Sequence, residues 1–200
     1  MTLDLYIFAG INGAGKSSLY SASTSKIKKS KRANADEIAR DNHWDWHDQS
    51  KNFKAMRLEV DRIYSFIENH QSFNMETTFA SSKNSYLKIL NKAKDQGFIT
   101  HLLYVGLGSP QLAKERVQAR VVKGGHGIPD KVIERRYPKS LKTLSEIISY
   151  FDTVEIYDNT YKFERIYKRD GNKIDVIDGY ESVPWAKQII NKDKMLLNLQ

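Results

Sequence analysis

Eight residues near the N-terminus have the types and the spacing of a phosphate-binding loop. Residues 10–17 (GINGAGKS) match the pattern G-x-x-x-x-G-K-[ST] at every fixed position. Glycines let successive backbone N–H groups converge on one anion, and the start of a following helix adds positive potential there. Lys16 would reach the β- and γ-phosphates of a nucleotide, and the Ser17 hydroxyl would hold Mg²⁺. The residues that we assign to ATP in this segment are Gly10, Ile11, Asn12, Gly13, Ala14, Gly15, Lys16, Ser17 and Ser18.

The segments on either side of this loop suit the motif. Residues 3–9 (LDLYIFA) are short and apolar, as a buried strand should be, and residues 17–20 (SSLY) can start a helix. A glycine turn between a strand and a helix is the context that gives the motif its meaning. The sequence therefore predicts a nucleoside triphosphate site.

A carboxylate follows at a position that would suit catalysis. Asp36 ends a strand-like segment at residues 32–35 and precedes a short helical pattern. Two interpretations remain open from spacing alone. Asp36 is either the base that accepts the proton of an acceptor hydroxyl or the N-cap of the helix.

Four arginines bracket one glycine-rich break. Arg116 and Arg120 are four residues apart, on one helix face, and Arg135 and Arg136 follow the break. Arginine suits a phosphoryl group because its fork can bond two oxygens at once. The arrangement predicts a mobile cationic lid over residues 110–142, with a solvated helix surface as the alternative.

The rest of the chain supplies elements that would position these groups. Strand-like segments alternate with helical ones, which predicts a parallel sheet with helices on both faces. We expect helices at residues 52–70, 84–95, 110–122 and 131–149, strands at 72–76, 98–107 and 153–157, a hairpin at 163–168 and 173–177, and a C-terminal helix from Pro184. In the first of these helices, Phe53, Met56, Val60, Ile63, Tyr64 and Ile67 form an apolar stripe. The expected fold is a three-layer α/β P-loop domain over residues 1–200, and its ligands should bind at the carboxyl ends of the strands.

Composition narrows the class of protein. The 200 residues are 40% apolar and include no cysteine, which suits one globular domain without disulfides or thiolate metal sites. No apolar run approaches the roughly 18 residues of a membrane span, and no secretory leader is evident, so we expect a cytoplasmic protein. The net charge of +8 is concentrated in residues 109–142 and in residues 26–32 (KIKKSKR). The second block is either a solvated connection or a polyanion-binding surface.

Other P-loop chemistries are matched less well. A GTPase reads its base with an N-K-x-D segment: residues 91–94 (NKAK) lack the aspartate, and residues 172–175 (NKID) fit the letters but fall in the expected hairpin. A motor ATPase needs an apolar strand that ends in aspartate, whereas residues 73–76 (FNME) are too polar. A kinase needs a base and a cationic lid, and both are predicted.

Three segments resemble the zeta-toxin family of P-loop kinases, particularly its short bacterial branch of predicted ATPases. They are residues 34–39 (NADEIA), 76–78 (ETT) and 116–140 (RVQARVVKGGHGIPDKVIERRYPKS). The resemblance extends from about residue 3 to residue 159, and the last segment is its most specific part. It implies a kinase that uses ATP and Mg²⁺ and phosphorylates a nucleotide-sugar such as UDP-N-acetylglucosamine. An antitoxin partner is also implied, whereas we expect neither nucleic acid nor a membrane as a partner.

The same resemblance assigns roles to residues by position. Asp36 matches the catalytic carboxylate, Lys16 a phosphate group, and Arg120 with Arg135 or Arg136 the catalytic lid arginines. The acceptor side is implied for Asn34, Glu76, Thr77 and Thr78, metal binding for Ser17 and Glu76, and nucleotide binding for Arg116 and Asn159. The larger toxins have an aspartate at the position of Asn34, and this difference leaves the identity of the acceptor open.

Two alternatives to this function remain. A nucleoside or polynucleotide kinase would use residues 26–32 and the tryptophans Trp44 and Trp46 to hold its acceptor, whereas an NTP-binding regulatory module would show only residual hydrolysis. The pair His43 and His47 invites a metal site, but the sequence offers no third ligand, and packing or capping is the simpler role.

Overall fold

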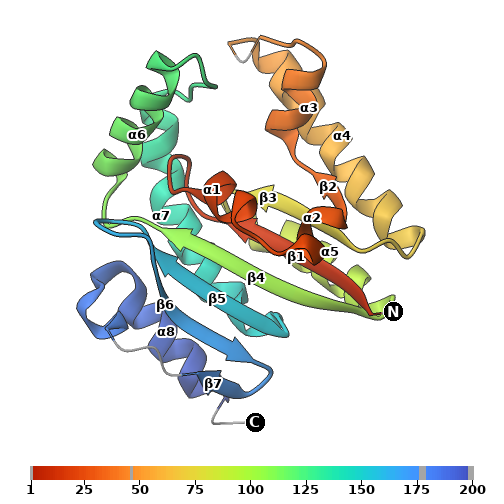
Figure 1. Ribbon diagram of the computed structural model, residues 1–200, viewed down its shortest axis with the longest axis vertical. Helices are drawn as coiled ribbons and strands as arrows, with labels where there is room; N and C mark the ends of the chain where they lie inside the picture. Colours follow the sequence, from red (N-terminus) through yellow and green to blue (C-terminus); the bar gives the residue numbers. More distant parts are fainter. Residues whose placement is uncertain (1, 46, 176–178, 198–200) are drawn as a thin grey trace.

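A seven-stranded sheet forms the centre of the protein in the computed structural model, which describes residues 2–45, 47–175 and 179–197 (Figure 1). The strand order is β2-β3-β1-β4-β5-β6-β7. The strands are β1 (Leu3–Ala9), β2 (Lys31–Ala33), β3 (Phe73–Thr77), β4 (Phe98–Gly106), β5 (Thr153–Asp158), β6 (Glu164–Asp170) and β7 (Lys173–Asp175). Strands β1 to β5 are parallel, and the β6–β7 hairpin adds an antiparallel edge.

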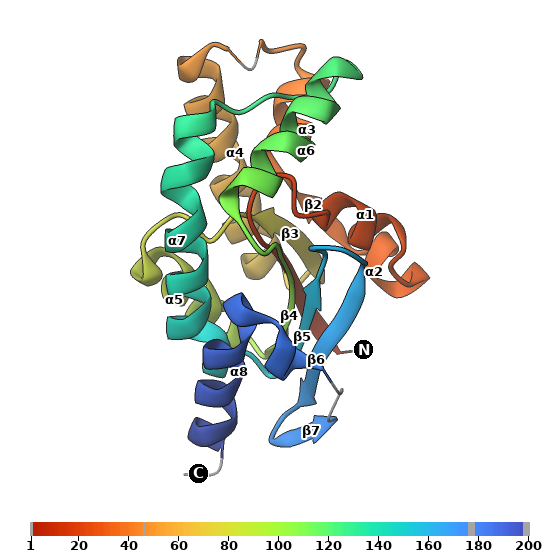
Figure 2. The same cartoon turned by 90° about the vertical axis from the view of Figure 1, so that its left-hand side faces the viewer.

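Helices cover both faces of this sheet. They are α1 (Lys16–Ser21), α2 (Ser25–Lys29), α3 (Ala35–Asp41), α4 (Gln49–Glu68), α5 (Lys83–Asp95), α6 (Pro110–Val122), α7 (Asp130–Ile147) and α8 (Pro184–Leu197), with short 3-10 turns at Ile148–Tyr150 and Tyr180–Ser182. Figure 2 shows α5, α7 and α8 on one side of the sheet and α1 and α2 on the other. The predicted three-layer α/β architecture is confirmed.

Two separate apolar clusters fill the space between the layers. The larger one packs α4, α5, α7 and α8 against one face of the sheet. The smaller one packs α1, α2, α6 and the start of α7 against the other face. Because β1 is central and lies between the two clusters, the loop that follows it has a rigid base.

Most predicted elements are present with small shifts at their ends. The helix expected at residues 52–70 begins earlier, at Gln49, because the Asp48 carboxylate accepts hydrogen bonds from the backbone N–H groups of Ser50 and Lys51. The helix expected at 131–149 ends in a 3-10 turn. The last two residues of the hairpin strand expected at 173–177 lie outside the described residues.

The structure corrects the expected strand at residues 32–35. Strand β2 is Lys31–Ala33, and Asn34 leaves it to cap α3. Asp36 is therefore neither the end of a strand nor a helix cap. Residues 26–32 form most of α2 and the start of β2, and the side chains of Lys26, Lys28, Lys29 and Lys31 are exposed.

The apolar stripe expected on α4 is only half buried. Ile63 and Ile67 lie in the core, but Phe53, Met56 and Val60 are 69%, 45% and 42% exposed. The N-terminal half of α4 extends beyond the sheet and packs with α3 around a small cluster of its own (Figure 1). A periodic pattern predicts a helix but does not say what covers each face of it. No helix among the described residues is long and apolar enough to cross a membrane.

Candidate active site

The phosphate-binding loop occupies residues 10–15, between the end of β1 and the start of α1. Gly10 has φ +137°, and a Cβ atom there would lie 2.1 Å from the Val105 carbonyl oxygen. Gly15 has φ +106°, and a Cβ atom there would lie 2.8 Å from Nδ2 of Asn159. Side chains at either position would collide with the neighbouring strand or loop. Both glycines are thus needed for the loop to lie close to its neighbours.

Lys16 is held inside the loop. Its Nζ donates hydrogen bonds to the Gly10 and Ile11 carbonyl oxygens over 2.9 and 3.3 Å, and it lies 3.8 Å from Oε1 of Glu76. Burial lowers the pKa of Lys16, and the carboxylates of Glu76 and Asp36 oppose that shift. The two predicted catalytic groups, Lys16 and Asp36, therefore act electrostatically on each other.

Glu76 is the centre of a polar network at the end of β3. Its Oε1 accepts a hydrogen bond from the Ser17 hydroxyl over 3.4 Å. Its Oε2 accepts hydrogen bonds from Nη2 of Arg32 over 3.1 Å and from Nδ2 of Asn34 over 3.2 Å. The network fixes one carboxylate oxygen and directs the other toward Ser17.

Asn34 positions the helix that carries Asp36. The Asn34 side-chain oxygen accepts the N–H groups of Asp36 and Glu37 over 2.9 and 3.3 Å, so Asn34 is the N-cap of α3. Its amide nitrogen meanwhile donates to Glu76, a bond that an aspartate could not make. Asn34 is 8% exposed and bonded to the protein, whereas Asp36 is exposed. A direct substrate contact by Asn34 stays a prediction.

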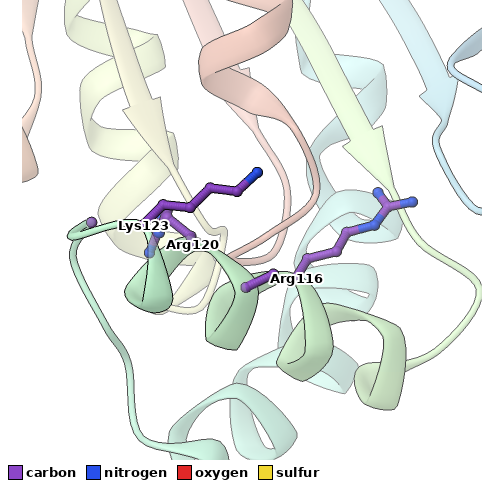
Figure 3. A pocket seen from close by; sticks show the side chains of 5 residues that line it. Arg116, Arg120 and Lys123 are labelled. Carbon is purple, nitrogen blue, oxygen red and sulfur yellow. The ribbon is translucent and has the colours of Figure 1, made fainter.

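Arg120 presents a buried guanidinium group without a protein partner at two nitrogens. Within the described residues, Nε and Nη2 of Arg120 are buried and make no hydrogen bond. Arg120 lines a cavity of about 340 Å³ with Arg116, Ala119, Lys123 and Gly125. In Figure 3, Arg120 of the last turn of α6 lies next to Lys123, which follows the helix, and Arg116 extends from the preceding turn. Buried donors without acceptors are costly, so this site suits an anion.

The other three arginines lie in different surroundings. Nη1 of Arg136 donates to the side-chain oxygen of Asn12 in the phosphate-binding loop over 3.1 Å. Nη2 of Arg116 donates to the Thr160 carbonyl oxygen over 3.4 Å. Arg135 is exposed on α7. The structure thus brings Arg120 and Arg136 toward Lys16, where their charges act on its pKa, and does not do so for Arg135.

The turn after β3 separates Thr77 from Thr78. The Thr77 hydroxyl pairs with the Tyr86 hydroxyl over 3.0 Å, whereas Thr78 is half-exposed. Phe79 then adopts φ +54°, a conformation that costs a bulky residue about 1–3 kcal/mol. Its buried ring packs against Tyr86, and this contact holds the turn.

Asn159 reaches the phosphate-binding loop from the loop after β5. Its Nδ2 donates to the Ala14 carbonyl oxygen over 2.8 Å. The carboxyl ends of β1, β3 and β5 thus carry the predicted site residues, together with α3, α6 and α7.

Comparison with known proteins now gives the family. The sequence matches the family described as "Zeta toxin" over residues 3–174. The protein belongs to the zeta toxin family. An uncharacterized protein of Haemophilus influenzae is 31% identical to it over 130 residues, which are 65% of this chain and 89% of that one.

Two solved structures share the fold of this zeta toxin family member. The AvrRxo1-ORF1:-ORF2 complex with ATP has a TM-score of 0.67 at 13% identity, and the match covers 98% of this chain and 76% of that one. A protein of the PezAT chromosomal toxin-antitoxin system of Streptococcus pneumoniae has a TM-score of 0.62 at 10% identity, and the match covers 98% and 86% of the two chains. With the family match, the P-loop kinase fold identifies the protein as a phosphotransferase.

The residues of this zeta toxin family site fit a magnesium ion. The Ser17 hydroxyl and Oε1 of Glu76 lie 3.4 Å apart, beside the loop that would hold the phosphates. Both are oxygen ligands of the kind that Mg²⁺ prefers, and phosphate oxygens and water normally complete its shell. The pair would therefore hold the ion between α1 and β3.

Arg32 is a site residue that the sequence motifs did not predict. Its side chain leaves the basic block at 26–32 and donates to Glu37 over 2.7 Å, to Asn74 over 2.7 Å and to Glu76 over 3.1 Å. Its guanidinium also stacks 3.8 Å from the Tyr20 ring centre. The only signal in the sequence was its place on a strand, where side chains alternate between faces.

Glu59 of α4 was not predicted from the sequence either. Burial raises the pKa of Glu59 from 4.5 to about 7, and the Asp36 carboxylate adds to the shift. Among the described residues, its Oε1 is buried without a hydrogen-bond partner. Glu59 therefore lies within electrostatic range of Asp36.

The His43–His47 segment connects α3 to α4. No cluster of three potential metal-ligating His, Cys, Asp or Glu side chains occurs in the part of the chain that the structure describes. Trp44 packs with the small α3–α4 cluster, and Lys54 lies 5.1 Å from its ring centre. Trp46 lies outside the described residues. Packing is thus the observed role of Trp44.

Proposed function

We propose that the protein transfers the γ-phosphoryl group of ATP to a hydroxyl of a nucleotide-sugar such as UDP-N-acetylglucosamine. One observation carries the proposal of a hydroxyl acceptor. The exposed carboxylate of Asp36 lies within electrostatic range of both Lys16 and Arg136. A carboxylate in this position suits an acceptor hydroxyl better than it suits the triphosphate itself, because a like charge would repel the phosphates.

Each of these residues has its own role in phosphoryl transfer. Asp36 accepts the hydroxyl proton as the acceptor oxygen forms its bond to the γ-phosphorus. The bond between that phosphorus and the bridging oxygen breaks, and ADP leaves with the electron pair. Lys16, Arg120 and Arg136 stabilise the charge on the transferring group. A bound Mg²⁺ would neutralise phosphate charge beside Ser17 and Glu76.

The choice of ATP is supported from two directions. The loop at residues 10–17 has the full sequence pattern and the observed strand-loop-helix geometry. The AvrRxo1-ORF1:-ORF2 complex, which shares the fold, was solved with ATP. Asn159 contacts the loop at Ala14, and Arg116 contacts the neighbouring Thr160; both are proposed to contact the nucleotide.

The acceptor side is proposed to consist of Asp36, Glu59, Thr78 and Glu76. Its carboxylates suit the hydroxyl and amide groups of an amino sugar, which can donate hydrogen bonds to them. The nucleotide-sugar itself is taken from the family resemblance.

The decisive experiment follows a labelled phosphate. The protein is incubated with γ-labelled ATP, Mg²⁺ and either UDP-N-acetylglucosamine or a bacterial metabolite extract, and products are identified by mass spectrometry. We expect one labelled hydroxyl-bearing nucleotide-sugar. Labelled nucleosides or oligonucleotide ends would replace the proposal with a nucleic-acid kinase, and ATP hydrolysis that no acceptor accelerates would replace it with a regulatory module.

Asp36→Asn tests the assigned base. We expect this variant to bind ATP with the affinity of the wild type and to lose transfer by about 10²–10⁴-fold, because the amide cannot accept the proton. Calorimetry measures the binding and the labelled product measures the transfer. Transfer at an undiminished rate would remove Asp36 from the mechanism.

An antitoxin is proposed as a protein partner. The support is the family and the structural likeness to a protein of a toxin-antitoxin system. We also propose that the protein acts in the cytoplasm, where ATP and nucleotide-sugars are available.

A further inference from the structure

The loop between β5 and β6 touches both the phosphate-binding loop and α6. Asn159 donates to the Ala14 carbonyl oxygen over 2.8 Å, and the Thr160 carbonyl oxygen accepts from Arg116 over 3.4 Å. The missing side chain of Gly15 leaves the space that Asn159 fills. The position of this loop therefore sets one wall of the nucleotide site.

A buried carboxylate holds the loop. Asp158 is 6% exposed, and its Oδ1 accepts the Thr160 hydroxyl over 2.6 Å and Nε1–H of Trp185 over 2.8 Å. Its Oδ2 accepts the Thr160 backbone N–H over 3.3 Å. All three donors are neutral, so each carries a large share of the stabilisation of a buried charge.

Trp185 reaches Asp158 from the C-terminal helix α8, and its ring fills the space left by the missing side chain of Gly106. A Cβ atom on Gly106 would lie 2.2 Å from the indole. Tyr104 packs against the other part of the ring system, with 5.9 Å between ring centres. The Gly106 carbonyl oxygen also accepts the Asn159 backbone N–H over 3.0 Å. The end of β4, the indole and the nucleotide loop thus meet at one point.

We infer that Trp185 is a positioning residue for the nucleotide site, acting through Asp158 on Asn159. It lies beyond residue 174, where the family match ends, so the C-terminal segment of this chain contributes to ATP binding. The inference rests on the proposed use of ATP but not on the acceptor. Loss of the indole N–H leaves the Asp158 carboxylate under-solvated, and the loop then relaxes away from Ala14.

The test is ATP affinity in Trp185→Phe, which keeps an aromatic ring and removes the N–H group. We expect the Kd and the KM for ATP to rise about tenfold, as for loss of a bond to a charged acceptor. kcat and the KM for the acceptor should stay within about twofold, since Asp36 and Arg120 are untouched. Asp158→Ala should weaken ATP binding at least as much, and adding Trp185→Phe to it should weaken binding no further.

Lys192→Ala is the matched control. Lys192 holds the same helix, α8, by donating to the Ser145 carbonyl oxygen over 2.9 Å, and it does not contact the nucleotide loop. It should leave ATP affinity unchanged. Wild-type affinity in folded Trp185→Phe, or equal weakening by Lys192→Ala, would overturn the inference.

A spectroscopic measurement keeps the inference testable if Trp185→Phe does not fold. The chain has three tryptophans, so Trp44→Phe with Trp46→Phe leaves Trp185 as the only one. Its emission should change on addition of ATP, and an unchanged emission at saturating ATP would contradict the inference. Because calorimetry measures ATP binding directly, a wild-type protein that binds ATP but phosphorylates nothing would refute the proposed function and leave this inference standing.

Discussion

Arg135 and Arg136 are adjacent in the sequence, yet only one of them points to the phosphate-binding loop. Arg136 donates to Asn12 over 3.1 Å, whereas Arg135 is exposed. The family pattern left the choice between them open, because neighbouring residues of a helix differ by a rotation of about 100°. The fold makes the choice by packing Ile133 of the same helix into the core.

This pair gives a matched test of the proposed lid. Arg136→Ala should reduce phosphoryl transfer by about 10²–10³-fold, since the transition state loses a charge-assisted contact. Arg135→Ala should change it by less than about threefold, because an exposed charge is screened. Steady-state rates with ATP and acceptor measure both. Equal losses in the two variants would contradict the assignment of Arg136.

Glu59 makes stability depend on pH. Burial and the nearby Asp36 raise its pKa from 4.5 to about 7, so the folded protein keeps a proton that the unfolded chain has already lost over this interval. Stability therefore falls as the pH rises from about 4.5 to about 7. Glu59→Gln stays neutral, and its melting temperature should exceed that of the wild type at about pH 8 and approach it at about pH 5.

Thermal unfolding in the two buffers measures this difference. Asp61→Asn, an exposed change on the same helix, is the control and should show a smaller dependence. A difference between Glu59→Gln and the wild type that does not vary with pH would show that Glu59 titrates normally.

The turn between α6 and α7 depends on close packing at Gly125. A Cβ atom there would lie 2.6 Å from Cγ of Arg120 and 3.0 Å from its carbonyl oxygen. Gly125→Ala should displace Arg120 and lower transfer by roughly tenfold or more while the melting temperature changes by less than about 4 °C. Gly97→Ala is the control. An added Cβ atom at Gly97 would have no neighbour within 4 Å, but the φ of +79° disfavours alanine. This variant should therefore lower stability and leave phosphoryl transfer unchanged.

Helices, strands and turns were predictable from the sequence where the residues of that segment alone define its structure. The phosphate-binding loop carries its own glycines, and Gly97 ends α5 with φ +79° as expected. Arg32 and Glu59 were not predictable, because their roles arise only where β2, β3 and α4 come together. The exposure of Phe53 has the same origin, since the sequence does not reveal that α4 extends past the sheet.

A buried ion pair fastens the last helix to the rest of the molecule. Nε of Arg169 lies 2.8 Å from Oδ2 of Asp193, and the two residues are 2% and 0% exposed. The guanidinium also donates to the carbonyl oxygens of Ile148 and Phe151 over 2.8 and 3.0 Å. The β6–β7 hairpin, the 3-10 turn that follows α7, and α8 are thereby joined at one point.

Breaking this pair should affect the whole protein. Arg169→Ala leaves the buried Asp193 carboxylate without its ionic partner and bonded to the neutral Tyr167 hydroxyl. The expected loss is about 3–5 kcal/mol, which corresponds to a melting temperature lower by about 6–20 °C. Lys168→Ala removes only a solvent-screened pair with Asp175 and should shift the melting temperature by less than about 4 °C. Differential scanning calorimetry distinguishes them, and similar shifts would mean that the buried pair adds no net stability.

The contact between Trp185 and Asp158 also bears on when the protein becomes active during its synthesis. The phosphate-binding motif is synthesised before β3 and β4, the two strands that flank β1 in the sheet. The indole contact that supports the loop of Asn159 can form only after residue 185 has emerged from the ribosome and α8 has docked. A growing chain that has not reached this point therefore carries the motif without the support of Trp185.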